Sequence, residues 1–538
     1  MKHLKKISAA LLAAALCLGC AACGQTGTAT TADSAAQSAV SLSTPSVDEM
    51  FSDRDYEIGY SDYCTVTLAD GASTADADGV TIDRDTITIT AAGTYLLTGT
   101  LSDGQLIVDA GENEKVQLVL SDASITCSGF AALYCRNADK VFVTTANGTE
   151  NELISTGEFA AIDDSNIDGA IYAKCDLTLN GAGTLTVRSA CGHGIVSKDD
   201  LAITSGSYLI DATKQGLSGK DSVRIAGGTL DITSGTDGIH AENDDTDKGF
   251  VFISGGTLTL STGDDGIHAN DALSISGGIV AITQCYEGIE SAVVDISGGD
   301  IDITASDDGI NAADGTSTEM MQTNDNCVLT ISGGTITINA EGDGVDSNGD
   351  LTVTGGTLLI DGSSNGGNGA LDYDGTGTIT GGTVIALDQP GMAMNFGSTS
   401  TQATALVTLD SQQAAGNVVT LTDAEGNFLL TYTARKAFQS VLVSCPDMAV
   451  GSTYTLTAGE ETQTIELTET INGASSGMGG APGQMGGEIP AQGERPDRSG
   501  RSDDDRTPPD FDNSTDRPEP PADGQFSGSD TNSADTSA

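Results

Sequence analysis

The sequence predicts an all-β protein, a right-handed parallel β-helix of about 22 residues per coil followed by a small C-terminal β module. Three observations support this prediction: the composition, a repeat of nearly constant length, and a period-two alternation of apolar and polar residues. The chain of 538 residues contains 69 Gly, no Trp and only 4% aromatic residues. Abundant Ser, Thr, Asp and Gly indicate many short strands joined by tight turns rather than helices.

The repeat becomes visible when one glycine of each Asp-Gly-Ile-like step is aligned with the next. These marker glycines are Gly169, Gly194, Gly216, Gly238, Gly266, Gly288, Gly309, Gly344 and Gly369. Successive gaps are 25, 22, 22, 28, 22, 21, 35 and 25 residues, and two long gaps contain the insertions NDDTDKG and DGTSTEMMQTNDN. A Gly-Gly pair keeps the same spacing and ends at Gly228, Gly256, Gly278, Gly299, Gly334, Gly356 and Gly382. This period fits a coil of about three short strands and three turns.

Each Gly-Gly pair is followed by a short strand in which apolar residues alternate with residues that are mostly Thr or Asp. The first apolar position holds Leu230, Leu258, Val280, Ile301, Ile336, Leu358 and Val384. The next holds Ile232, Leu260, Ile282, Ile303, Ile338, Ile360 and Ala386. Period-two alternation directs one set to the interior, and a single unit is too small to bury its own apolar face. We therefore expect stacked coils with continuous interior ladders, a pattern that leucine-rich repeats and propeller blades do not match.

The N-terminus carries the features of a bacterial export signal. Three lysines within the first six residues precede a short apolar run at 7–18, and the GCAACGQ that follows resembles a lipoprotein processing site. We expect lipidation at Cys23, with Cys20 as the second candidate and a plain secretory signal as the alternative. All three interpretations place the mature protein outside the cytoplasm, and lipidation places it on the bacterial cell surface.

The predicted organisation has five parts. Residues 1–23 form the signal peptide, 24–46 a disordered tether, and 47–400 the parallel β-helix. Residues 401–471 form a small β module or cap, with a hairpin in NVVTLTDAEGNFLLTYTA and a further strand in GSTYTLTAG. Residues 472–538 form a disordered, acidic tail rich in Gly and Pro.

The charge balance and the cysteines restrict the possible partners. Acidic residues outnumber basic residues by 77 to 22, which gives a formal net charge of -55. Nucleic acid is excluded as a partner, because little basic surface is available to neutralise phosphates. Three of the 11 cysteines lie in the export signal. The other eight, from Cys64 to Cys445, show no CxxC pair, so they do not form a zinc pattern and are either disulfide-bonded or small buried residues. We expect a monomer.

Stacked coils would convert the repeated acids into columns. The residue before each marker glycine is Asp168, His193, Gln215, Asp237, Asp265, Glu287, Asp308, Asp343 or Asn368. Strands of successive coils lie about 4.8 Å apart, and two carboxylates at that distance repel by roughly 3 kcal/mol at an effective dielectric near 20. From Gly249 to Ala434 the chain has 24 Asp and Glu but no Lys or Arg, so no Lys or Arg salt bridge can form within that stretch.

Calcium is the predicted counter-ion, because it binds carboxylate, amide and backbone oxygens. The predicted ligands are Asp237, Asp264, Asp265, Glu287, Glu290, Asp307, Asp308, Asn311, Asp343 and Asp346. The alternative is that these acids are exposed turn residues, where Asp-Gly pairs are common for backbone reasons. His240 and His268 lie one coil apart and allow zinc binding, but a stacked surface pair is the simpler interpretation.

A basic column precedes the acidic ones. Lys174, Lys198 and Lys220 are spaced by 24 and 22 residues, which would place them at the same turn of successive coils. They are the predicted ligand-binding residues, suited to an acidic sugar polymer. The alternative is that they are exposed turn lysines that pair with neighbouring acids.

These motifs resemble a known family. The segment AAGTYLLTGTLSDGQLIVDA, the ISGGTLTL strands and the DDGIHA turns are similar to secreted bacterial carbohydrate-binding β-helix proteins that bind cellulose and polygalacturonate. The resemblance covers roughly residues 63–397. It implies calcium in a fold related to polysaccharide lyases, with ligands at the DDGI positions Asp264, Asp265, Asp307 and Asp308.

Three functions are compatible with these features. The favoured one is a cell-surface, calcium-dependent binding protein for plant-type polysaccharide, polygalacturonate or cellulose, which touches the membrane only through a lipid anchor. Because Trp is absent, recognition would be polar or calcium-bridged rather than by stacking on sugar rings. The alternative is a calcium-dependent polysaccharide lyase, which needs a basic residue near the acids, and only Lys198, Lys214, Lys220 and Lys248 come close. A structural or adhesive solenoid is the third possibility. No catalytic residue is predicted.

Overall fold

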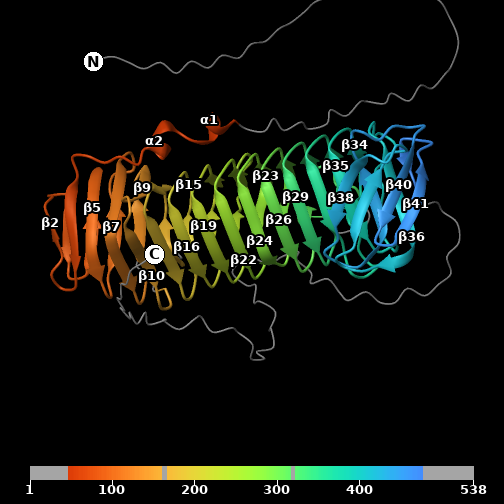
Figure 1. The fold of residues 1–538 in the computed structure, drawn as a ribbon. Helices are drawn as coiled ribbons and strands as arrows, with labels where there is room; N and C mark the ends of the chain where they lie inside the picture. Colours follow the sequence, from red (N-terminus) through yellow and green to blue (C-terminus); the bar gives the residue numbers. More distant parts are fainter. Residues whose placement is uncertain (1–45, 160–166, 317–321, 476–538) are drawn as a thin grey trace, which may run out of the picture. The chain divides into compact units, whose positions relative to one another are not determined.

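The computed structural model describes residues 46–159, 167–316 and 322–475, which belong to one compact unit. They form a parallel β-solenoid of about 12 turns with a separate small antiparallel sheet (Figure 1), so the predicted fold class is confirmed. The export signal, both lipidation candidates and nearly all of the predicted tether and tail lie outside the described residues. Within the described ranges, no helix is long and apolar enough to cross a membrane.

Each regular coil contributes one short strand to each of three parallel faces, A, B and C. Face A contains β10 (Glu150–Ser155), β13 (Thr184–Ser189), β16 (Ser207–Ala212), β19 (Thr229–Ser234), β22 (Thr257–Thr262), β24 (Ile279–Cys285), β26 (Asp300–Ala305), β29 (Thr335–Ala340), β32 (Thr357–Asp361) and β35 (Thr383–Asp388). Face B contains β8 (Leu133–Asn137), β11 (Gly169–Ala173), β14 (His193–Ser197), β17 (Leu217–Gly219), β20 (Ile239–Ala241), β27 (Ile310–Ala312), β30 (Val345–Ser347) and β33 (Leu371–Tyr373). Face C contains β9 (Lys140–Thr145), β12 (Asp176–Gly181), β15 (Asp200–Ile203), β18 (Ser222–Ile225), β21 (Phe250–Ile253), β28 (Val328–Ile331), β31 (Asp350–Val353) and β34 (Gly377–Ile379).

Two longer strands each cross from face B to face C, namely β23 (Ile267–Ile275) and β25 (Ile289–Ile296). The first coils are less regular. They are built from β1 (Cys64–Ala69), β2 (Thr74–Ala75), β3 (Val80–Asp83), β4 (Thr86–Ile89), β5 (Gly93–Leu101), β6 (Gln105–Asp109) and β7 (Lys115–Cys127).

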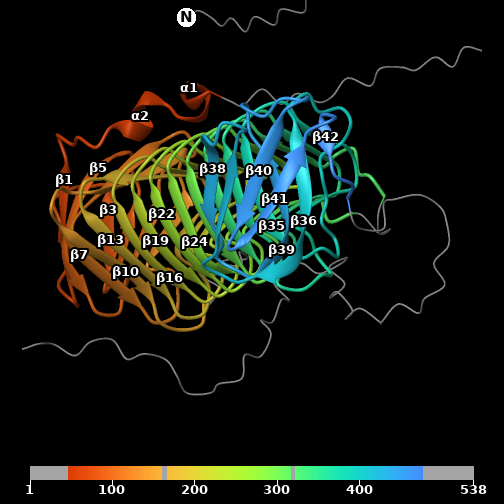
Figure 2. The same cartoon turned by 45° about the vertical axis from the view of Figure 1, so that its right-hand side comes forward.

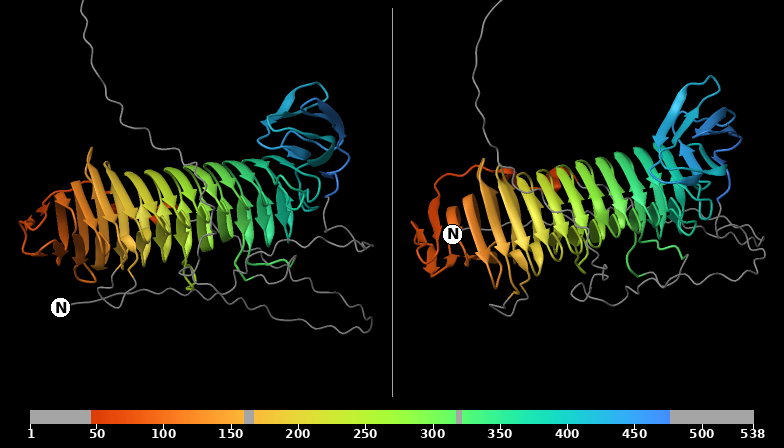
Figure 3. Two further views of the ribbon diagram at one scale, coloured as in Figure 1. Left: turned by 90° about the horizontal axis from the view of Figure 1, so that it is seen from below. Right: turned by 60° about the horizontal axis from the view of Figure 1, so that its bottom comes forward.

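Strands of successive coils pair in parallel and in register, which superposes equivalent residues of the repeat. On face A, Leu230 of β19 pairs with Leu258 of β22, and Ile232 pairs with Leu260. Both predicted sets of apolar residues are buried in one continuous core that runs through the solenoid. Figure 3 shows the resulting stack of coils, and the interior ladders are confirmed.

Two kinds of glycine make the tight turns possible. The second glycine of each Gly-Gly pair, such as Gly256 with a φ of 98°, has a positive φ that other residues adopt only with strain. The marker glycines meet a different constraint, the close approach of the next coil. A Cβ atom on Gly266 would lie 2.6 Å from the carbonyl oxygen of Gly288 and 2.7 Å from Ile282 Cδ1. Both repeated sequence markers therefore have a steric cause.

The segment before the first coil differs from the prediction, because it forms two short helices rather than part of the β-helix. These helices, α1 (Val47–Met50) and α2 (Asp53–Tyr56), form a strap at 46–57 that lies along face C (Figures 1 and 2). Arg224 of β18 donates a hydrogen bond of 2.7 Å to the carbonyl oxygen of Met50. Apolar contact between Phe51 and Phe252 holds the same end of the strap.

A buried ion pair holds the other end of the strap. The carboxylate of Asp55 lies 2.8 Å from Lys140 Nζ and accepts a hydrogen bond of 2.6 Å from Thr178. Burial alone would raise the pKa of Asp55, but the hydrogen bonds and the charge of Lys140 lower it to about 2. Asp55 is therefore ionised and paired at every ordinary pH.

The C-terminal module consists of two β layers. β36 (Thr404–Gln413), β39 (Phe438–Ser444) and β42 (Ile471–Asn472) extend the sheet beyond β35, and β35 and β39 are antiparallel. The second layer is a four-stranded antiparallel sheet of β37 (Val418–Thr422), β38 (Phe428–Thr433), β40 (Thr453–Ala458) and β41 (Glu461–Glu466). The predicted hairpin corresponds to β37 and β38, and the predicted additional strand to β40. The module has an apolar core of its own.

Two basic residues that directly follow the acid-rich stretch 249–434 form ion pairs with acids inside it. Arg435 forms a bidentate pair with Asp302 at 2.8 and 2.9 Å, and Lys436 lies 3.0 Å from Glu341. The sequence shows that no base lies within the stretch, but it does not show that the next two residues fold back over face A. These pairs compensate acids of face A, whereas the acids before the marker glycines lie elsewhere on the coils.

Lys140→Met should release the strap. The substitution leaves the buried carboxylate of Asp55 without its cation, a loss of about 3–5 kcal/mol. We expect faster amide hydrogen exchange at residues 46–57 and unchanged exchange in the interior strands. Lys115→Met is the matched control, because its ion pair with Asp139 is exposed and contributes about 1 kcal/mol or less. Unchanged exchange in the strap of the Lys140 variant would show that the ion pair does not hold it.

Candidate metal-binding face

The outward-pointing middle residues of face B form a single row along the solenoid. Parallel register places each beside its equivalent in the next coil, as for His240 with His268 and Glu290 with Asn311. From the N-terminal end, the row reads Tyr134, Tyr172, Val196, Ser218, His240, His268, Glu290, Asn311, Asp346 and Asp372. The row therefore begins with two tyrosines, contains two histidines in its middle, and ends with carboxylate and amide side chains.

The acids before the marker glycines stack at the turn between face A and face B, next to this row. The N–H of Gly238 donates to the carbonyl oxygen of Asp265, and the N–H of Gly288 donates to that of Asp308, so the predicted column exists. Five of its acids are buried, with exposed fractions of 0–6%: Asp237, Asp265, Glu287, Asp308 and Asp343. The interpretation of these five as exposed turn residues is therefore wrong. Asp264 and Asp307 are half-buried.

Backbone N–H groups provide part of the compensation for the stacked charges. The N–H of Asp265 donates to Asp237 Oδ1 at 3.2 Å, and the N–H of Asp343 donates to Asp308 Oδ1 at 2.7 Å. A hydrogen bond to an ionised carboxylate is stronger than one between neutral groups. The repulsion calculated from the sequence is therefore reduced before any cation is considered.

The two histidines are held by carboxylates. Their rings stack with centroids 5.0 Å apart and an interplanar angle of 11°. His240 Nδ1 lies 2.7 Å from Asp237 Oδ2, and His268 Nδ1 lies 3.1 Å from both Asp265 Oδ2 and Glu290 Oε2. Burial lowers the pKa of His268, but the hydrogen bonds to the two carboxylates outweigh it and raise that pKa well above its usual value. In the absence of a metal ion, a proton holds this cluster together.

In the next coils, the possible metal ligands of this row are all oxygen atoms. Asp308, Asp343 and Asp346 converge, and burial followed by the charges of neighbouring acids raises the pKa of Asp308 to about 9. Asn311 donates a hydrogen bond of 3.0 Å to Glu287 Oε2, while its own Oδ1 is buried without a hydrogen-bond partner. This amide oxygen and the neighbouring carboxylates are the type of ligand that calcium prefers.

Three groups of acids and histidines in the described ranges have ligand atoms within 4.8 Å of one another. The groups are Asp237, Asp264 and Asp265; Asp265, His268 and Glu290; and Asp308, Asp343 and Asp346. Seven of the ten ligands predicted from the sequence belong to these groups. Glu287 and Asn311 contact each other nearby, whereas Asp307 belongs to none of the three.

The sequence suggests zinc binding by His268 only together with His240, and the structure instead groups His268 with Asp265 and Glu290 as a candidate metal-binding cluster. The signal was present in its spacing, because His268 follows Asp265 by three residues and precedes Glu290 by one coil. Stacking one coil on the next brings both acids to the same imidazole nitrogen.

The predicted lysine column also exists. The N–H of Lys198 donates to the carbonyl oxygen of Ala173, and the N–H of Lys220 donates to that of Ser197, so the lysines stack at the turn between faces B and C. All three, including Lys174, are exposed. Their position gives face B a basic border in its N-terminal half.

Aromatic rings lie under two of these lysines. Lys174 Nζ lies 5.8 Å from the ring centroid of Tyr134, and Lys198 Nζ lies 5.6 Å from that of Tyr172. Both tyrosines are buried, so they support the lysines and offer no flat surface on which a sugar ring could stack.

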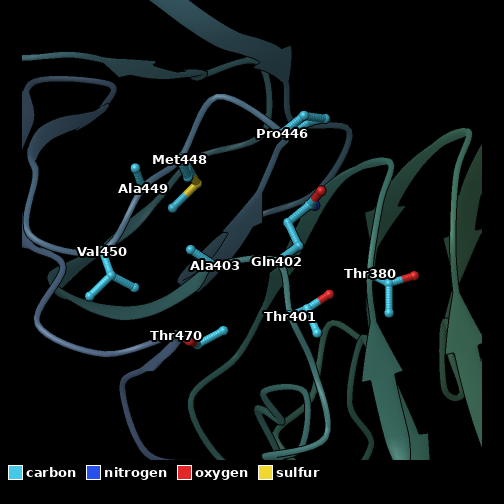
Figure 4. A pocket seen from close by; sticks show the side chains of 9 residues that line it. All are labelled: Thr380, Thr401, Gln402, Ala403, Pro446, Met448, Ala449, Val450 and Thr470. Atoms are coloured by element: carbon cyan, nitrogen blue, oxygen red, sulfur yellow. The ribbon is translucent and has the colours of Figure 1, made fainter.

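A cavity of about 370 Å³ lies away from this face, where the last coils meet the C-terminal module (Figure 4). Its lining is Thr380, Thr401, Gln402, Ala403, Pro446, Met448, Ala449, Val450 and Thr470. No charged side chain lines it, so it does not suit an acidic ligand or a metal ion.

Comparison with known proteins identifies the family of this chain. Residues 83–320 and 271–420 match the family of carbohydrate-binding domain-containing proteins. The chain belongs to this family. The match includes the lysine column and all three groups of metal-ligand side chains, so these features are part of the carbohydrate-binding domain.

Two similar proteins have been characterised at the sequence or structural level. A carbohydrate-binding domain-containing protein of Acetivibrio thermocellus is 36% identical over 145 residues, which cover 27% of this chain and 51% of the relative. The match therefore spans about half of that relative's length. The structure of the polysaccharide lyase-like protein from C. thermocellum, a gadolinium derivative, shows 34% identity and a TM-score of 0.38. The match covers 44% of this chain and 93% of the polysaccharide lyase-like protein.

Asp308→Asn should stabilise the metal-free protein at high pH. The pKa of Asp308 is raised to about 9, far above about 4 in an unfolded chain, so folding favours the protonated carboxyl. Its contribution to stability is complete below about pH 4 and is lost as the pH rises toward 9. In EDTA at pH 8, we expect the amide to raise the free energy of unfolding by more than about 1.4 kcal/mol, the equivalent of one pKa unit. Near pH 4 the difference should vanish.

Denaturant unfolding at both pH values measures this effect. Asp350→Asn is the control, because Asp350 is exposed on β31 and should show little change at either pH. A less stable Asp308 variant at pH 8 would contradict the assignment of a protonated, buried carboxyl.

Proposed function

We propose that the protein is a calcium-dependent carbohydrate-binding protein of the bacterial cell surface. The proposed ligand is a plant-type polysaccharide, polygalacturonate or cellulose, and the chemistry of the face favours the acidic polymer. The observation that supports this most strongly is the arrangement on face B. There, a column of exposed lysines and a cluster of carboxylates follow one another along a single face of a carbohydrate-binding domain.

The donor set around Asp308 supports calcium. Asp308, Asp343 and Asp346 offer carboxylate oxygens, and the unpartnered Oδ1 of Asn311 lies in the row between Glu290 and Asp346. Calcium takes about six to eight oxygen ligands, so these residues would leave positions for water or for oxygens of the polysaccharide. A uronate carboxylate is a suitable ligand for such a position.

The lysines support an acidic ligand at the other end of the face. Five coils separate Lys220 from Asp346, a distance of about 24 Å at the spacing of stacked strands. An extended polymer lying along the solenoid reaches both places at once. The lysines would pair with its carboxylates directly, and calcium would bridge the others to the protein.

The lysines nearest the acids are engaged by carboxylates, which favours polysaccharide binding over lyase cleavage. Lys214 Nζ lies 3.7 Å from Asp168, and the hydrogen bond from Lys248 to Asp221 raises the pKa of Lys248. The raised pKa of Lys248 makes it a poorer acceptor for the α-proton of a uronate, and Lys214 is engaged by a carboxylate. The remaining lysines, Lys198 and Lys220, belong to the exposed column.

The cell-surface location rests on the export signal and on the processing site at Cys23, with Cys20 as the second candidate. A lipid anchor there would leave the tether between the membrane and the first described residues. The membrane would then be contacted only through the lipid.

The mature protein should be retained on polygalacturonate in the presence of calcium and released by a chelator. Asp346→Asn should weaken retention by at least about tenfold, because it removes a proposed calcium ligand. Asp350→Asn is the control, since this exposed acid lies four residues further along the chain and outside the cluster. Retention that does not depend on calcium would reject the calcium part of the proposal. Unsaturated uronate in the supernatant, detected by its ultraviolet absorbance, would make the protein a lyase.

The double variant Lys198→Ala, Lys220→Ala should bind the acidic polymer more weakly, by up to about tenfold, and with a smaller dependence on salt. Lys115→Ala is the control, because Lys115 is an equally exposed lysine that pairs with Asp139 outside the column. Calcium affinity measured without the polymer should be unchanged in both variants. Equal retention of the double variant and the control would show that the column is not part of the binding surface.

A further inference from the structure

We propose that face B also contains a chemically different metal site, held by Asp265, His268 and Glu290, for a divalent transition-metal ion of the zinc class. This site lies on the coils that precede the proposed calcium cluster. The inference does not rest on calcium binding or on the polysaccharide, because it concerns a different set of ligands.

The ligand atoms of the three side chains lie within 4.8 Å of one another. His268 Nδ1 lies 3.1 Å from Asp265 Oδ2 and 3.1 Å from Glu290 Oε2. Two ligand atoms of a tetrahedral zinc ion with bonds of about 2.0–2.1 Å lie about 3.3 Å apart. The distances between the imidazole nitrogen and the carboxylates therefore need to change by only a few tenths of an ångström to accept such an ion.

An unsatisfied buried oxygen provides independent support. Asp265 is 0% exposed, and its Oδ1 has no hydrogen-bond partner although the other oxygen of the same carboxylate contacts His268. A buried carboxylate oxygen without a partner loses the hydration of the unfolded state and gains nothing in return. A metal ion bound at His268 would satisfy this carboxylate.

The imidazole distinguishes this site from the all-oxygen cluster. Imidazole nitrogen is a common ligand of zinc and of neighbouring transition metals, whereas calcium binds through oxygen. The His268 ring is fixed by stacking on His240, which is itself held by Asp237 at 2.7 Å. Such surrounding contacts orient a metal-ligating histidine.

The site is open on one side. The side chain of His268 is 18% exposed, while those of Asp265 and Glu290 are 0% and 10% exposed. Three protein ligands and a partly open side are typical of zinc sites that keep a position for water or for an exogenous ligand. An oxygen donor from outside the chain can therefore complete the coordination.

Metal binding by the full chain tests the proposal. Accessible thiols are first alkylated, because the exposed Cys191 would otherwise bind zinc by itself. Equilibrium dialysis with Zn²⁺ in excess Ca²⁺ should show about one tightly held ion per chain. Co²⁺ in its place should give a visible spectrum without thiolate charge-transfer bands. His268→Gln should weaken Zn²⁺ binding by at least about tenfold, and Glu290→Gln should do the same if the histidine variant fails to fold.

The matched control is Asp346→Asn, which should keep Zn²⁺ affinity and lose Ca²⁺ affinity, whereas His268→Gln should keep Ca²⁺ affinity. This crossed result separates the two sites, so the calcium proposal can fail while the zinc-class site stands. The inference is overturned if Zn²⁺ binds equally well to wild type and to both ligand variants, or if excess Ca²⁺ displaces it.

Discussion

The rest of the structure depends on the in-register backbone ladder between successive coils. Each turn must bring two coils within hydrogen-bonding distance, and the carbonyl oxygen of Gly288 leaves no room for a side chain on Gly266. Glycine at this position fixes the register, and the register in turn decides which side chains become neighbours. Residues about 22 positions apart in the sequence are therefore in contact, as His268 and Glu290 are.

This rule explains which parts of the fold could be predicted from the sequence. The interior ladders, the acid column and the lysine column all follow from repeat spacing and alternation, because each depends on a neighbour one coil away. The strap and the clasp of Arg435 on Asp302 could not be predicted in this way. They join residues that share no repeat, such as Asp55 with Thr178, 123 positions apart, and Asp302 with Arg435, 133 positions apart, so neither contact leaves a periodic signal.

The candidate site was predictable in position but not in environment. Spacing identifies seven of the clustered acids, Asp308 among them, but it does not show that Asp308 is buried with an exposed fraction of 3%. Burial then changes its chemistry, since desolvation disfavours the charged carboxylate and adjacent acids add to this effect. In the absence of metal, protons at His268 and Asp308 reduce the repulsion among the stacked acids. A metal ion bound at either proposed site would compete with protons for the same groups, so its affinity would increase with pH.

The strap gives the molecule a defined response to mechanical load. Its first residues contact Arg224 and Phe252 in the middle of the solenoid, and Asp55 contacts Lys140 several coils nearer the N-terminal end. If the chain is anchored as proposed, tension applied at residue 46 would reach the central coils first, and the strap would have to detach before the force reached β1. The strap would thus take up applied force before the less regular first coils do. The proposed polymer-binding face lies on a different side of the coil, so load applied there would not unwind the solenoid from its end.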